Sequence, residues 1–109
     1  MGSDYVKISI EGLNMTQKEK NETCIHATVS GKVQGVFFRE SVRKKAEELQ
    51  LTGWVKNLSH GDVELVVCGE RDSIMILTEW LWEGPPQAAV SNVNWEEIVV
   101  EDYSDFRVR

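Results

Sequence analysis

The sequence predicts a single α+β domain in which two helices cover one face of an antiparallel sheet of four or five strands. Segments in which apolar residues alternate with polar ones are interrupted twice by segments whose apolar residues recur at helical spacing. Each change falls at a glycine-rich or turn-forming stretch. The predicted order of elements is therefore βαββαβ, with an extra strand at the C-terminal end.

The first strand is predicted over residues 24–30 and the first helix over residues 38–49. Apolar residues occupy alternate positions in the strand and every third or fourth position in the helix, so each element has one apolar face. These positions are Ile25, Ala27 and Val29 in the strand, and Phe38, Val42, Ala46 and Leu49 in the helix.

A β-hairpin follows, with strands over residues 53–57 and 62–68 joined by a tight turn. The second helix comes next. Asp72 and Ser73 are candidate caps for its start, and Gly84, followed by two prolines, ends it. Its wide apolar face consists of Ile74, Ile76, Leu77, Trp80 and Leu81.

Two more strands are predicted, over residues 90–101 and 106–109. Right-handed crossovers then place the first and third strands side by side and antiparallel, with both helices on one face of the sheet. This is the ferredoxin-like arrangement.

The two cysteines have neither metal-ligand spacing nor a C-x-x-C arrangement, which excludes a zinc site and a thioredoxin-like site. The predicted topology brings Cys24 near Cys68, so a disulfide between them is possible. A reducing cytosol would favour free thiols.

Residues 1–23 are mostly polar and are predicted to be a disordered leader, so the domain is assigned to residues 24–109. Within the leader, Val6, Ile8 and Ile10 alternate with polar residues and could pair with an exposed sheet edge.

Composition limits the possible partners and location. The formal net charge of -6 opposes extended binding to nucleic acid, which requires many lysine and arginine contacts to phosphates. No run approaches the roughly 18 to 20 apolar residues that span a bilayer, and no secretory signal is apparent. We therefore expect a cytoplasmic protein with no membrane or nucleic-acid partner.

Residues 31–39 join the first strand to the first helix and contain two glycines four positions apart. Such a loop can turn several backbone amides toward one point, and the helix N-terminus adds positive potential. Arg39 supplies a forked cation. The sequence therefore predicts a phosphate site, with candidate binding residues Gly31, Lys32, Val33, Gln34, Gly35, Val36 and Arg39.

The predicted topology also brings Asn57, at the end of the second strand, to the same edge of the sheet. A carboxamide there can both donate and accept, so it can hold a water molecule in line with a bound phosphorus atom. The alternative is that Asn57 caps the hairpin turn through its own backbone, as asparagine often does.

The string G-x-V-Q-G-V-x-F-R over residues 31–39 resembles a signature of the acylphosphatase family. Residues 53–57, with Gly61, Val63 and Gly69, resemble that family's second signature. The resemblance implies a monomeric, metal-free and cofactor-free enzyme that hydrolyses small acyl phosphates to carboxylate and inorganic phosphate. It also implies catalytic roles for Arg39, which binds phosphate, and Asn57, which positions the attacking water.

Three alternatives remain open at this stage. The first is a small-anion-binding or regulatory module on the same fold without turnover. The second is an RNA-binding sheet, which the negative charge disfavours. The third gives a catalytic role to His26 or His60, although His26 lies on a strand and His60 lies in a turn where the family commonly carries Asp or Asn.

Overall fold

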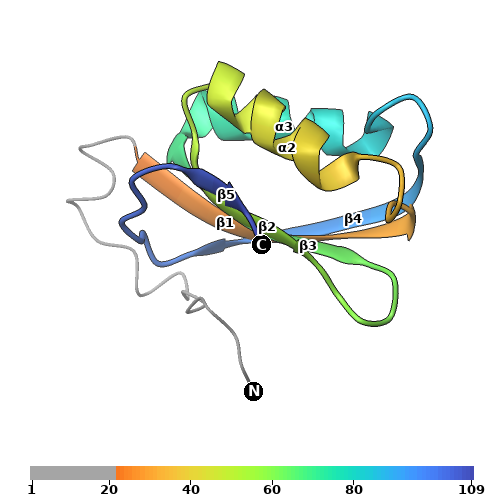
Figure 1. Cartoon of the computed structure of the whole chain (residues 1–109). Coiled ribbons are helices and arrows are strands. Elements are labelled where there is room, and N and C mark those ends of the chain that lie inside the picture. Colours follow the sequence, from red (N-terminus) through yellow and green to blue (C-terminus); the bar gives the residue numbers. More distant parts are fainter. Residues whose placement is uncertain (1–21) are drawn as a thin grey trace.

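The computed structural model describes residues 22–109 and has two layers, a five-stranded sheet and two helices on one of its faces (Figure 1). In chain order the elements are β1 (Glu22–Lys32), α2 (Phe38–Glu48), β2 (Thr52–Asn57), β3 (Val63–Glu70), α3 (Arg71–Glu83), β4 (Ala89–Ile98) and β5 (Phe106–Val108). Within this part of the chain, no helix is both long and apolar enough to cross a bilayer.

The strand order is β4-β1-β3-β2-β5, so the ferredoxin-like prediction is confirmed, including the antiparallel pairing of β1 with β3. The prediction of a wholly antiparallel sheet is wrong in one respect, because β5 pairs with β2 in parallel. β4 and β5 lie at opposite edges of the sheet. The segment between them therefore has to cross from one edge of the sheet to the other. After this crossing, β5 runs in the same direction as β2.

The main core lies between the sheet and the helices and is built from the residues that the two periodicities identify. The alternating positions of β1 and β3 face it, as do the helical stripes of α2 and α3, except that Ile76, predicted for the apolar face of α3, is 49% exposed. Its fully buried members include Ile25, Ala27, Val29, Phe38, Val42, Ala46, Val63, Leu65, Val67, Ile74, Leu77 and Leu81.

The starts of β1 and α3 differ from the sequence predictions. β1 begins at Glu22, so Glu22 and Thr23 belong to the sheet and not to a leader. The remaining leader residues, including the alternating segment around Ile8, lie outside the described residues. α3 starts at Arg71, directly after β3, and no side-chain hydrogen bond caps it, so Asp72 and Ser73 lie inside the helix. Gly84 ends α3 as predicted, with its amide donating to the Trp80 oxygen (2.9 Å).

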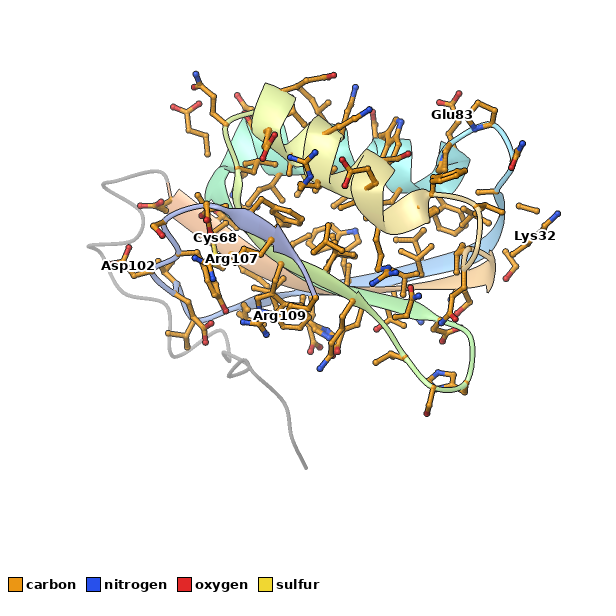
Figure 2. The ribbon with its side chains drawn as sticks, in the orientation of Figure 1. Lys32, Cys68, Glu83, Asp102, Arg107 and Arg109 are labelled. Atoms are coloured by element: carbon orange, nitrogen blue, oxygen red, sulfur yellow. A yellow bond between two sulfur atoms is a disulfide. The ribbon has the colours of Figure 1, made fainter. Side chains whose placement is uncertain are left out.

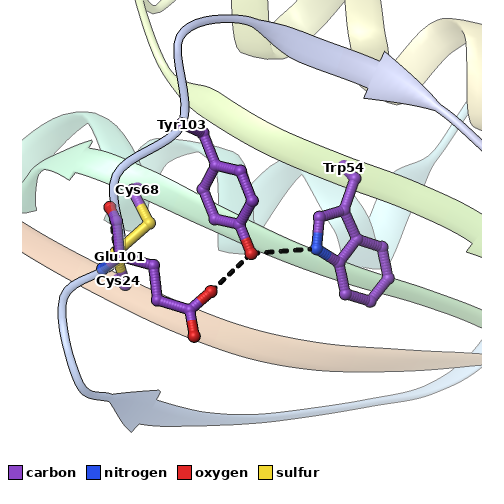
Figure 3. The surroundings of a disulfide bond; sticks show 5 residues. All are labelled: Cys24, Trp54, Cys68, Glu101 and Tyr103. Atoms are coloured by element: carbon purple, nitrogen blue, oxygen red, sulfur yellow. Dashed lines mark hydrogen bonds between the residues drawn. A yellow bond between two sulfur atoms is a disulfide. The ribbon is translucent and has the colours of Figure 1, made fainter. Parts of the chain in front are cut away.

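A second, smaller apolar cluster lies on the sheet face away from the helices. The segment 99–105, predicted in part as strand, leaves the sheet after Ile98 and contributes Tyr103 to this cluster. The Trp54 indole, only 1% exposed, donates to the Tyr103 hydroxyl at 3.1 Å, and that hydroxyl donates to Glu101 (Figure 3). Burial of the Tyr103 phenol raises its pKa, and the hydrogen bond to Glu101 adds to this effect.

The disulfide Cys24–Cys68 is part of the same cluster (Figure 3). The two residues are direct partners in the β1–β3 register, with Cα atoms 4.1 Å apart. The sequence-based preference for free thiols is therefore wrong for this structure, because the strand pairing holds the two side chains within bonding distance.

We expect the double substitution Cys24→Ala/Cys68→Ala to lower the free energy of unfolding by about 2–4 kcal/mol, because the bond closes a long loop in the unfolded chain. Denaturant unfolding followed by far-UV circular dichroism measures this difference. Dithiothreitol should lower the free energy of unfolding of the wild-type protein toward that of the variant, and it should not change that of the variant. Equal stability of the oxidised protein and the variant would contradict the prediction.

Candidate active site

An open cleft with a volume of about 360 Å³ lies where α2 begins, next to the ends of β2 and β5. It brings together Arg39 and Asn57, which are 18 positions apart in the printed sequence. The residues that line it are Val33, Gly35, Phe37, Phe38, Arg39, Glu40, Asn57 and Val108.

The loop between β1 and α2 lines this cleft and contains several amides without a backbone acceptor. Gly35 and Phe37 both have left-handed backbones, with φ of 74° and 63°. Alternation of left-handed with ordinary residues turns successive N–H groups toward a common centre, which favours an anion. Within residues 22–109, the amides of residues 34–40 donate to no backbone carbonyl, and the first helical bond is from the Ser41 amide to the Phe37 oxygen (3.0 Å). The loop therefore has the unpaired donors that an anion site requires.

Four of the predicted binding residues do not line the cleft: Gly31, Lys32, Gln34 and Val36, of which Val36 is buried in the main core. Gly31 and Lys32 belong to β1 and pair with Val90 and Ala89 of β4 across a register shift. Figure 2 shows Lys32 at the outer end of the sheet, directed to solvent. A Cβ atom on Gly31 would lie 2.3 Å from the Ala89 oxygen, so this glycine permits the close approach of β4. The loop proper thus starts at Val33.

Gln34 does not point into the cleft but joins the loop to the β2–β3 turn. Its Nε2 donates to the main-chain oxygens of Leu58 (2.8 Å) and Asp62 (2.9 Å). Leu58 directly follows Asn57, and the Leu58 amide donates to the Asp62 oxygen (2.8 Å). The carboxamide of Gln34 therefore fixes the loop relative to the strand end that carries Asn57.

Arg39 lies in the first turn of α2 and is half-buried. Its Nη1 donates to the main-chain oxygen of Arg109 at 2.8 Å. Arg109 is held in turn by its amide, which donates to the Val55 oxygen (2.8 Å). The guanidinium is thus oriented from the far end of the described chain, and its remaining N–H groups can contact an anion in the cleft.

Asn57 is the last residue of β2 and is exposed. Its carboxamide makes no hydrogen bond within residues 22–109, and the turn that follows is held by backbone bonds and by the Gln34 side chain. The turn-capping alternative is therefore not realised here, and the side chain can bind water or a ligand.

The other titratable candidates lie elsewhere or are already paired. His26 Nε2 lies 2.8 Å from Glu64 on the sheet face away from the helices, and His60 Nε2 lies 3.1 Å from Asp62 in the β2–β3 turn. Neither lines the cleft. Glu40 does line it, and its hydrogen bond to Arg43 lowers the pKa of the carboxyl group. Within residues 22–109, no group of three or more His, Cys, Asp or Glu side chains could hold a metal ion.

We expect Gln34→Glu to lower kcat/KM by about tenfold or more, because a carboxylate would replace two hydrogen bonds with repulsion from two carbonyl oxygens. The loss should fall mainly on kcat, since misalignment of the loop and Asn57 affects the transition state more than phosphate binding. Steady-state hydrolysis of an acyl phosphate measures it. Gln87→Glu, an exposed position with the same change of charge, is the matched control. Equal kinetics of the two variants would contradict the proposal that Gln34 aligns the loop with Asn57.

Comparison with known proteins agrees with the fold and with the sequence signatures. The acylphosphatase family model matches residues 25–108. The chain is 99% identical over 95 residues to an acylphosphatase of Coxiella burnetii, an alignment that covers 87% of this chain and all of that protein. A solved acylphosphatase from the same organism superposes with a TM-score of 0.82 at 98% identity, covering 87% of this chain and all of the other.

A more distant structure supports the same assignment. The acylphosphatase of Bacillus subtilis superposes with a TM-score of 0.78 at 31% identity, covering 80% of this chain and 98% of the other. The match to the family model extends over most of the chain, and the relatives are covered almost completely. The chain therefore belongs to the acylphosphatase family.

Proposed function

We propose that the protein hydrolyses acyl phosphates to a carboxylate and inorganic phosphate, without a metal ion or cofactor. The observation that carries this proposal is the joint presence, in one cleft, of a guanidinium, free loop amides and an unbonded carboxamide. This set can neutralise a phosphoryl group and orient a water molecule. Membership of the acylphosphatase family supports the same reaction.

In the proposed mechanism, the loop amides and Arg39 bind the non-bridging oxygens of the phosphoryl group. These donors matter most where negative charge builds up in the transition state. Asn57 holds a water molecule opposite the leaving group. The water oxygen forms a bond to phosphorus while the bond from phosphorus to the acyl oxygen breaks, and the electron pair leaves with the carboxylate.

The proton balance does not require a side-chain base. The carboxylate is a good leaving group, so the nucleophile needs little activation. A phosphoryl oxygen accepts the proton that the water loses, and the products are a carboxylate and inorganic phosphate. This agrees with the positions of His26 and His60, neither of which lines the cleft.

We also propose that the protein acts as a monomer in the cytoplasm, with a small acyl phosphate as its ligand and no nucleic-acid or membrane partner. The negative net charge supports the exclusion of nucleic acid. The cleft is formed by elements of one chain, so catalysis needs no second copy.

Hydrolysis of benzoyl phosphate, followed with and without a chelator, tests the proposed reaction. We expect equal rates under the two conditions, because Arg39 and the amides supply the positive charge. Loss of activity on chelation would contradict the metal-free mechanism. Stabilisation of the fold by inorganic phosphate without any hydrolysis would instead select an anion-binding module.

A further inference from the structure

Phe37 lies in the lining of the cleft in a conformation that is unfavourable in two respects. Its backbone is left-handed, with φ 63° and ψ 26°, a region that bulky residues rarely adopt. Its side chain is 79% exposed. Such a combination at a candidate site suggests that the position serves a function rather than the stability of the fold.

The adjacent Phe38 shows the usual arrangement of this side chain. Phe38 is 1% exposed and its ring lies 6.1 Å from that of Trp80, between the helices. In contrast, no aromatic ring within residues 22–109 packs against Phe37. The left-handed backbone at residue 37 sends the two consecutive rings to different environments, one to the core and one to the cleft.

The rest of the lining indicates what kind of group would contact the Phe37 ring. Val33, Phe38 and Val108 are apolar, and in the described part of the chain Arg39 is the only cation that lines the cleft. Arg39 is already assigned to the phosphoryl group. Glu40 stays anionic in the neutral range because Arg43 lowers the pKa of its carboxyl group. A negatively charged acyl group would therefore be repelled by the Glu40 carboxylate and would find no second cation in the lining.

We propose that Phe37 determines substrate specificity by packing against the acyl group, and that the preferred substrates are acyl phosphates with an apolar aryl or branched alkyl group. This inference rests on the proposed hydrolysis of acyl phosphates. A phosphoryl group held by the amides of residues 34–38 carries its acyl group close to the side chain of residue 37. The exposed ring then gains an apolar contact when substrate binds.

Comparison of benzoyl phosphate with acetyl phosphate tests this assignment in the wild-type protein, Phe37→Ala and Phe37→Leu. We expect Phe37→Ala to lower kcat/KM for benzoyl phosphate about tenfold, mainly through KM, and for acetyl phosphate about twofold. Phe37→Leu keeps an apolar side chain and should retain most of the preference for benzoyl phosphate over acetyl phosphate. The unfolding temperature of both variants should not fall, because the ring is exposed.

The outcomes separate the two proposals. An equal loss on both substrates, or no loss on either, would overturn the role of Phe37 and leave the hydrolytic function in place. Loss of stabilisation by inorganic phosphate in Phe37→Ala would also overturn it, since residue 37 would then act by shaping the loop. Failure of the wild-type protein to hydrolyse either substrate would overturn the proposed function itself.

Discussion

Replacement of Arg39 by alanine is expected to lower kcat/KM for benzoyl phosphate by about a thousandfold and to abolish stabilisation by inorganic phosphate. Arg39 carries the one positive side chain in the described lining of the cleft, and its guanidinium is held by Arg109 at 2.8 Å. Without it, the loop amides alone would face the phosphoryl charge. Steady-state kinetics and the phosphate dependence of the unfolding temperature measure the two effects.

The matched control is Arg71→Ala, which removes the same charge from an ion pair with Glu97 that is remote from the cleft. We expect this variant to stay folded, because exposed ion pairs contribute only about 0–1 kcal/mol to stability, and to keep its activity within about twofold. If Arg39→Ala still bound phosphate like the wild-type protein, the assignment of the guanidinium to the phosphoryl group would be wrong.

Replacement of Asn57 by alanine is expected to separate binding from turnover. We expect kcat to fall by about a hundredfold to a thousandfold, while inorganic phosphate still raises the unfolding temperature. The physical reason is that the Asn57 carboxamide makes no bond within the described chain and can orient the water, whereas other groups hold the phosphoryl oxygens.

Asn94→Ala is the control for this second prediction, because Asn94 is also exposed on a strand but does not line the cleft. Comparable turnover of the wild-type protein and Asn57→Ala would eliminate the water-positioning role. Loss of phosphate stabilisation in Asn57→Ala would mean that the carboxamide binds the anion directly.

The order and type of the elements could be predicted because each apolar face has a local signature. Alternation identifies β1 and β3, and the spacing of Phe38, Val42 and Ala46 identifies α2. The pairing of β1 with β3, and hence the meeting of Cys24 with Cys68, follows from the handedness of the crossovers.

Features that depend on distant parts of the chain could not be predicted in the same way. Alternation places Trp95 on the face of Val93, but it does not indicate that β4 is an edge strand, where Trp95 stays 42% exposed. The parallel pairing of β5 and the early end of β4 at Ile98 have a common cause. The segment between them crosses the sheet to cover Trp54, and no local pattern encodes that path.

The same distinction applies to the site. The glycine spacing and the family signatures identified the loop, Arg39 and Asn57, and the structure places these groups around one cleft. Their catalytic roles stay predictions. The assignment of Gly31 and Lys32 to the phosphate site was wrong because β1 is longer than predicted and extends to Lys32. The hydrogen bonds of Gln34 to the β2–β3 turn and of Arg39 to Arg109 join residues 24 to 70 positions apart, so no local pattern indicates either of them.

Arg39 is supported by Arg109, which directly follows β5, and this has a consequence for how the site loses its order. β5 has three residues and lies at the sheet edge, where it is held to β2 by bonds such as that from the Gly53 amide to the Asp105 oxygen (2.9 Å). Edge segments of this kind fray at a lower free-energy cost than the core. Each fraying event would release the guanidinium while the two-layer sandwich stays folded, so on heating the catalytic geometry should fail before the protein as a whole melts.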